Sequence, residues 1–88
     1  MQKYQCNKEV HAFKIGAIER LGGIVRLAGQ NNLVQVSEEW ISKHSPGKGD
    51  MTLTSMLGGY FVLYKDGYQS FSPAEAFEEG YTAMEEIF

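Results

Sequence analysis

Between residues 58 and 82, the hydrophobic and polar positions predict a strand, a tight turn, a second strand, a capped helix and a return strand. Aromatic and β-branched residues fill positions 60–64, a composition typical of strands. Asp66 and Gly67 follow as a two-residue turn signal of type I′, a turn that needs positive φ at both central positions. Both faces of the resulting hairpin are apolar, so we expect it to lie in the middle of a sheet.

The two-residue turn also predicts the register of this hairpin. It places Tyr64 opposite Gln69 and Val62 opposite Phe71. Because neighbouring side chains of a strand point to opposite faces, Val62 and Phe71 should then share one face, with Phe61 on the other.

The helix after the hairpin has signals at both of its ends. Ser72 and Glu75 have the spacing of a capping box, in which each side chain accepts a hydrogen bond from the backbone N–H of the other. Pro73 would occupy the first helical position, and Gly80 would end the helix in the left-handed conformation. Loss of the Ser72 hydroxyl should therefore cost about 1 kcal/mol.

The first half of the chain predicts further strands from a weaker alternation. We expect one strand over residues 8–15 and a second hairpin formed by residues 24–28 and 33–36. Gly29-Gln30-Asn31-Asn32, between the last two strands, is typical of a turn.

Ser37 then begins a short helix as its N-cap. Val36 and Ile41 have the spacing of a hydrophobic staple. Trp40, the only tryptophan, either packs on the sheet or belongs to a partner surface. The charges of this helix follow its dipole, with Glu38 and Glu39 at its start and Lys43 and His44 at its end.

A mobile loop is predicted over residues 47–58, and it is more apolar than a linker needs to be. The loop either folds over the core or forms an interface, and the sequence leaves both possibilities open. Its candidate partner-binding residues are Met51, Leu53 and Met56.

Length and composition indicate a single domain over residues 1–88. We expect an α+β fold in which two short helices pack on a small, mostly antiparallel β-sheet of four to six strands. Cys6 is the only cysteine, which excludes an internal disulfide and is typical of a reducing compartment. No leader-like segment and no apolar run near 18 residues is present, so we expect neither export nor membrane spanning.

Three segments of the chain carry a resemblance to a known group of proteins: HAFKI, VSEEWISKHSPGKG and GYFVLYKDGYQSFSPAEAFEEGY. Together they resemble small phage and prophage proteins of unknown function. The chain departs from that pattern at residues 50–57, an apparent insertion, and at residues 84–88, which we expect to form a flexible tail. The resemblance implies a phage origin and a place in the bacterial host cytoplasm, and the family has no catalytic motif that would imply an activity.

The charge of the chain is divided unevenly. Residues 1–65 hold all eight Lys and Arg against five acids, whereas residues 66–88 hold six acids and no base. This acidic end is either a solvated surface or a patch that docks on a basic partner. Basic residues are sparse and unclustered, so we expect no direct nucleic-acid binding. The candidate docking residues here are Glu78, Glu79, Glu85 and Glu86, together with the apolar Ile87 and Phe88.

Motifs that carry chemistry are missing from the sequence. Cys6, His11 and His44 do not have the spacing of a zinc site. The Gly47-Lys48-Gly49 stretch lacks the remaining residues of a phosphate-binding loop. We therefore expect no cofactor, no metal and no enzymatic activity.

The function expected from these observations is protein–protein binding by a phage-derived accessory protein, for example inhibition of a bacterial host or anti-phage defence factor. One alternative is a minor virion or assembly component, in which the same surfaces would self-associate. A second alternative is a small-ligand binder that uses the tyrosine-rich face formed by Tyr60, Tyr64, Tyr68 and Tyr81.

Overall fold

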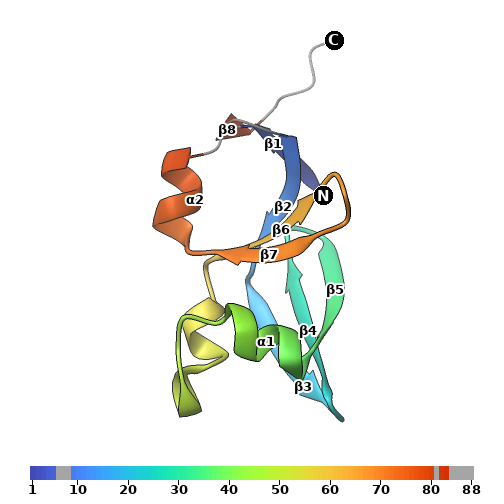
Figure 1. Ribbon diagram of the computed structural model, residues 1–88, viewed down its shortest axis with the longest axis vertical. Coiled ribbons are helices and arrows are strands. Elements are labelled where there is room, and N and C mark those ends of the chain that lie inside the picture. Colours follow the sequence, from blue (N-terminus) through green and yellow to red (C-terminus); the bar gives the residue numbers. More distant parts are fainter. Residues whose placement is uncertain (6–8, 81, 84–88) are drawn as a thin grey trace.

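The computed structural model describes residues 1–5, 9–80 and 82–83, which form an α+β fold (Figure 1). Strands of the described residues form two antiparallel sheets, one in the order β7-β6-β2-β1-β8 and one in the order β3-β4-β5. Two α-helices and two short 3-10 helices, η1 and η2, complete the fold. In chain order the elements are β1 (Gln2–Gln5), β2 (Glu9–Lys14), β3 (Ala17–Leu21), β4 (Ile24–Gly29), β5 (Asn32–Ser37), α1 (Glu38–His44), η1 (Gly49–Met51), η2 (Thr54–Met56), β6 (Tyr60–Tyr64), β7 (Gln69–Ser72), α2 (Ala74–Gly80) and β8 (Thr82–Ala83).

The predicted α+β class is confirmed, but the strands are divided between two sheets because the chain changes sheet after β2. The backbone N–H of Ile15 donates to the carbonyl of Gly59, and the N–H of Gly58 donates to the carbonyl of Ile15, each over 2.8 Å. The next residue, Gly16, instead donates to Ala28 in β4, also over 2.8 Å. Consecutive residues between β2 and β3 thus continue the hydrogen bonding of different sheets, as at the corners of orthogonally packed sheets. The sequence predicted a strand over 8–15 but not its continuation as β3.

Two hairpin turns of the three-stranded sheet have the type I′ conformation. Gly22 and Gly23, between β3 and β4, have φ values of 52° and 90°. Gln30 and Asn31, between β4 and β5, have φ values of 49° and 65°. Both pairs therefore meet the requirement of positive φ at two successive positions, and the predicted second hairpin is confirmed.

The turn between β6 and β7 differs from the prediction. It has three residues, because the N–H of Tyr64 donates to the carbonyl of Tyr68 over 2.9 Å and the N–H of Gly67 donates to the carbonyl of Tyr64 over 2.9 Å. Only Gly67 in this turn has positive φ, at 91°. Such a loop is a type I turn followed by a bulge. The Asp66 side chain stabilises it by accepting a hydrogen bond from the Tyr68 N–H over 2.9 Å.

The extra turn residue shifts the register of this hairpin by one position. Leu63 lies opposite Gln69 and Phe61 lies opposite Phe71. Phe71 therefore shares a face with Phe61 and not, as predicted, with Val62, since a shift of one residue reverses the face of every side chain. The prediction that the hairpin is central holds for β6 only, because β7 forms an edge of its sheet.

The start of α2 also differs from the prediction. The N–H of Phe77 donates to the carbonyl of Pro73 over 3.0 Å, so Pro73 is the capping position and Ser72 remains in β7. The Ser72 hydroxyl donates to the Pro73 carbonyl over 3.4 Å, and no capping box with Glu75 forms. Gly80 is the last residue of α2, and its φ is not positive, so it does not adopt the predicted left-handed conformation. Loss of the Ser72 hydroxyl should accordingly cost less than the ~1 kcal/mol of a true cap.

The start of α1 agrees with the prediction. The Ser37 hydroxyl accepts a hydrogen bond from the Trp40 N–H over 3.0 Å. Val36 and Ile41 are both buried in the same cluster, as a hydrophobic staple requires. The Trp40 indole N–H donates to the carbonyl of Gln69 over 3.1 Å, which joins α1 to β7. Trp40 is thus packed on the sheet.

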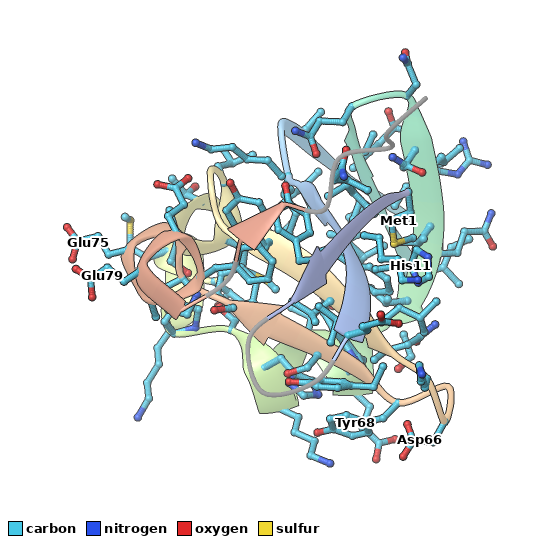
Figure 2. The ribbon with its side chains drawn as sticks, turned by 90° about the horizontal axis from the view of Figure 1, so that it is seen from above. Met1, His11, Asp66, Tyr68, Glu75 and Glu79 are labelled. Carbon is cyan, nitrogen blue, oxygen red and sulfur yellow. The ribbon has the colours of Figure 1, made fainter. Side chains whose placement is uncertain are left out.

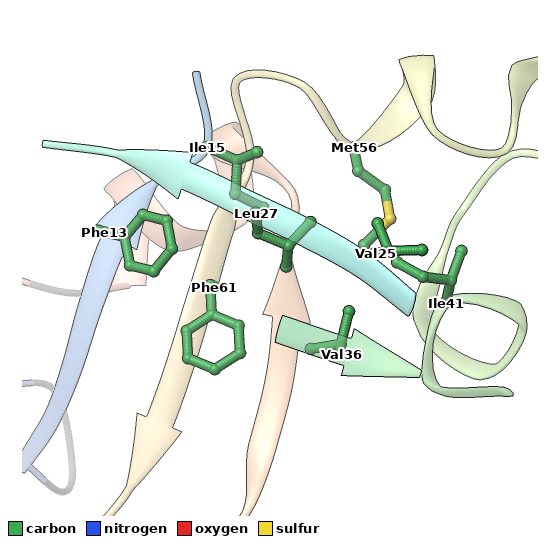
Figure 3. Packing of buried hydrophobic residues seen from close by; sticks show 8 residues of the cluster. All are labelled: Phe13, Ile15, Val25, Leu27, Val36, Ile41, Met56 and Phe61. Atoms are coloured by element: carbon green, nitrogen blue, oxygen red, sulfur yellow. The ribbon is translucent and has the colours of Figure 1, made fainter. Parts of the chain in front are cut away.

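Two hydrophobic clusters hold these elements together. The first lies between the two sheets, α1 and η2 (Figure 3), and the second lies between α2 and the opposite face of the five-stranded sheet. The first contains Phe13, Ile15, Val25, Leu27, Val36, Ile41, Met56 and Phe61. The second contains Val10, Ala12, Tyr60, Val62 and Phe77. The centre of the five-stranded sheet is therefore covered on both sides, as its two apolar faces predicted.

Candidate partner-binding surface

The segment between α1 and β6, predicted as a mobile loop, is an ordered part of the fold. It contains η1 and η2 and is joined to the end of α1 by the Ser45 hydroxyl. This hydroxyl donates to the carbonyl of Thr52 over 2.6 Å and lies 3.1 Å from the Ser55 hydroxyl. The N–H of Gly47 donates to the Ser45 oxygen over 3.1 Å. These bonds hold the apolar residues of the segment in defined positions.

Those apolar residues are divided between core and surface. Met56 has an exposed fraction of 0%, so its predicted role in partner binding is wrong. It is buried because η2 turns its side chain into the first cluster, where it contributes to the core (Figure 3). Leu53 is half-buried against that cluster, whereas Met51 and Leu57 are 57% and 48% exposed. The segment therefore folds over the core on one side and presents apolar side chains on the other.

A surface hollow of ≈ 330 Å³ lies between this segment and the start of β3. We call it the β3 groove, and its lining carries no charged residue: Gly16, Ala17, Ile18, Leu53, Thr54 and Leu57. A second hollow of ≈ 170 Å³ adjoins it on the outer face of the three-stranded sheet and shares Ala17. Apolar surface thus continues from η2 across the beginning of β3.

Strand β3 bordering this groove is an edge strand. Among the described residues, β4 is the one strand that pairs with β3, and this pairing uses the backbone N–H and C=O groups on one side of β3. An edge with free backbone groups can accept a strand from another chain, and adjoining pockets then bind alternate side chains of that strand. The groove and the edge together therefore have the two features of a strand-addition site.

The acids predicted to dock on a partner have different environments. Glu79 is exposed and points outward from α2, as does Glu75, which was not among the predicted docking residues (Figure 2). Glu78 instead accepts hydrogen bonds from the Tyr60 hydroxyl over 2.8 Å and from the Lys14 ammonium over 3.3 Å, both at Oε2. These bonds lower the pKa of Glu78. The Glu78 carboxylate thus joins α2 to the sheet, while Glu79 remains available for docking.

The remaining candidates of the acidic end lie outside the described residues, as does the predicted tail over residues 84–88. They are Glu85, Glu86, Ile87 and Phe88. Cys6 also lies outside the described residues.

The pKa of Tyr60 is raised, and its measurement tests whether α2 packs on the sheet. Burial, followed by the hydrogen bond to Glu78, raises the pKa of Tyr60 from 10.0 to about 12. The folded protein therefore holds the Tyr60 hydroxyl proton to a higher pH than the unfolded chain does. The contribution of this hydroxyl to the free energy of unfolding should be present below pH 10 and lost as the pH rises toward 12. Burial also raises the pKa of Tyr4, so we expect a tyrosinate absorbance titration to show a late component that is smaller by one tyrosine in Tyr60→Phe.

The matched variant for this titration is Glu78→Gln. It removes the charge next to the hydroxyl but not the burial, so the late component should move to lower pH and stay above 10.0. A Tyr60→Phe titration that loses a component near pH 10 and keeps the late component would contradict the predicted contact.

Aromatic side chains near the β6–β7 turn form a different kind of surface. The rings of Trp40 and His44 lie 4.6 Å apart, and His44 lies 6.2 Å from Tyr68. Hollows of ≈ 340 Å³ and ≈ 410 Å³ adjoin Tyr68 on its α1 side and on the side of Tyr64. Burial, and then the charge of Lys43, lower the pKa of His44.

The tyrosine-rich ligand face that the sequence offered as an alternative is only partly assembled. Tyr64 and Tyr68 are 5.8 Å apart beside these hollows. Tyr60 instead stacks on Phe77 beneath α2, with the ring centroids 4.1 Å apart, and Tyr81 lies outside the described residues. The register of the turn, which the sequence did not predict correctly, brings Tyr68 opposite Tyr64. Tyr60 lies four residues earlier in β6, where α2 covers the same face of the strand.

Within residues 1–5, 9–80 and 82–83, no group of three His, Cys, Asp or Glu side chains is placed to hold a metal ion. No helix in the described part of the chain is long and apolar enough to cross a membrane. Comparisons with models of protein families, with curated proteins and with solved structures find no match to this chain.

Proposed function

We propose that this chain is a small non-enzymatic protein that acts by binding another protein at the β3 groove. The observation that carries the proposal is the apolar, uncharged lining of the groove next to the free edge of β3. Leu57 is about half exposed there, and burial of a large aliphatic side chain stabilises a complex by roughly 1.5–3 kcal/mol when it is complete. A partner that adds a strand to β3 would cover Leu57 and bond the free backbone groups at once.

The phage-like sequence segments support a narrower version of this proposal. In that version the protein is a phage-derived accessory protein in the bacterial host cytoplasm, and its partner is a host or anti-phage defence protein that it inhibits. The exposed Glu75 and Glu79 on α2 add an acidic surface that favours a partner with basic residues near its binding site.

Capture from phage-infected or lysogenic bacterial cells tests the proposal with Leu57→Glu. A carboxylate in the groove would have to be desolvated on binding, so this variant should lose a partner that the wild type retains. Quantitative mass spectrometry of the captured proteins measures the loss.

Met51→Glu is the matched control for this experiment. Met51 is even more exposed than Leu57 and lies in the same segment, but it does not line the groove. We expect the partner to be retained by Met51→Glu. Loss with Met51→Glu and retention with Leu57→Glu would place the contact outside the groove and contradict the proposal.

A further inference from the structure

Two opposite charges on the outer face of the three-stranded sheet have no partner among the described residues. Glu19 in β3 and Arg26 in β4 lie directly opposite each other in the sheet register. Neither takes part in any ion pair or side-chain hydrogen bond of the described chain. The Nε of Arg26 is also shielded from solvent without a hydrogen-bond acceptor. A buried donor without an acceptor costs free energy, so a side-chain conformation that brings the Arg26 guanidinium to a carboxylate would be favoured.

Along the strands, the neighbours of this charge pair on the outer face are apolar and partly exposed, while Gln35 of β5 lies opposite Arg26 across the strands. On the same face, Ala17 lies opposite Ala28 and Leu21 lies opposite Ile24. Leu21 and Ile24 are both exposed, and the neighbouring Leu33 in β5 is 60% exposed. The charge pair is therefore flanked by an apolar pair on either side along the strands.

We propose that this face binds a second copy of the chain. Consider a two-fold axis that runs parallel to the strands, just outside the outer face and midway between β3 and β4. This axis would place β3 of each copy over β4 of the other. Glu19 of each copy would then face Arg26 of the other copy, and the pairs of alanines and of large aliphatic residues would meet in the same way. Such an interface is isologous, because every contact occurs twice.

The charges decide between this axis and the other possible axes. An axis above β4 would bring the two copies of Arg26 together, and an axis perpendicular to the strands through Arg26 would do the same. Like charges in contact oppose association. Of these axes, only the one above the line midway between β3 and β4 brings each charge to its opposite. It offers the Arg26 guanidinium the Glu19 carboxylate of the other copy, in addition to that of its own chain, for two parallel hydrogen bonds.

The face consists of three short strands, so the interface is small and the dimer should dissociate on dilution. The inference does not rest on the proposed function, because the dimer uses the outer face while Leu53 and Leu57 line the β3 groove. Only Ala17 borders both surfaces.

Sedimentation equilibrium over a wide range of concentration tests the inference with the charge reversals Arg26→Glu and Glu19→Arg. The wild type should show a monomer–dimer equilibrium, and each reversal alone should weaken it at least about tenfold, because both reciprocal pairs become like-charge contacts. The two variants mixed in equal amounts should form a heterodimer, since every contact then joins opposite charges again.

The mixture separates contact between copies from an effect within one chain. Within each variant the neighbouring charges on β3 and β4 are alike, so a fault of folding would persist in the mixture. The doubly reversed variant, Arg26→Glu with Glu19→Arg, should dimerise as the wild type does, and circular dichroism checks that each variant is folded. A wild type that stays monomeric at every concentration, or single reversals that dimerise as the wild type does, would overturn the inference.

Discussion

Replacing Phe77 with alanine should lower the free energy of unfolding by about 3–5 kcal/mol. Phe77 is 1% exposed and is the buried residue through which α2 packs on the five-stranded sheet. Its ring stacks on Tyr60 and lies 4.7 Å, edge to face, from Tyr4. Because a domain of this size is stable by only roughly 5–15 kcal/mol, the change removes a large part of the total. Urea unfolding followed by circular dichroism measures it.

Two variants make this experiment specific. Phe77→Leu keeps most of the apolar volume and should lose clearly less stability than Phe77→Ala. Glu79→Ala changes an exposed position of the same helix and should remain within about 0.5 kcal/mol of the wild type. A loss below about 1 kcal/mol for Phe77→Ala would contradict the packing of α2 on the sheet.

Replacing Met56 with alanine should cost about 2–5 kcal/mol. Met56 is fully buried between the two sheets and α1, although its segment has the composition of a connecting loop (Figure 3). Truncation would leave a cavity beside Val25 and Ile41, since the ordered 3-10 turns cannot collapse freely into it. Thermal and urea unfolding both measure the loss.

Met51→Ala is the control for Met56→Ala, because both methionines belong to the same segment. Met51 is 57% exposed, and its truncation should change the free energy of unfolding by no more than about 0.5 kcal/mol. Equal losses for the two variants would mean that the segment does not contribute to the core as described.

The candidate surface was only partly predictable. The sequence indicated an apolar segment over residues 47–58, yet it did not distinguish the buried Met56 from the exposed Leu57. That distinction depends on the two 3-10 turns, which the hydrogen bonds of the Ser45 hydroxyl with the Thr52 carbonyl and the Ser55 hydroxyl support. The other side of the groove comes from β3, a strand that the alternation of the first half did not predict.

The sequence by itself determined the features that depend on neighbouring residues. The Ser37 cap, the staple of Val36 and Ile41, and the second hairpin all formed as predicted. In each case the interacting groups lie within a few residues of one another, so local geometry is sufficient.

Tertiary structure alone decided which of several locally allowed conformations was adopted. Asp66 and Gly67 suit a two-residue or a three-residue turn, and the pairing of Phe61 with both Phe13 and Phe71 on the core face selects the longer one. A side chain at Gly29 would place its Cβ 2.0 Å from the Lys14 carbonyl, a contact that exists only because the chain changes sheet at residues 15–16. Contacts between residues far apart in the chain set the register, the sheet order and the groove, because side-chain packing favours one arrangement over alternatives that local propensity leaves nearly equal.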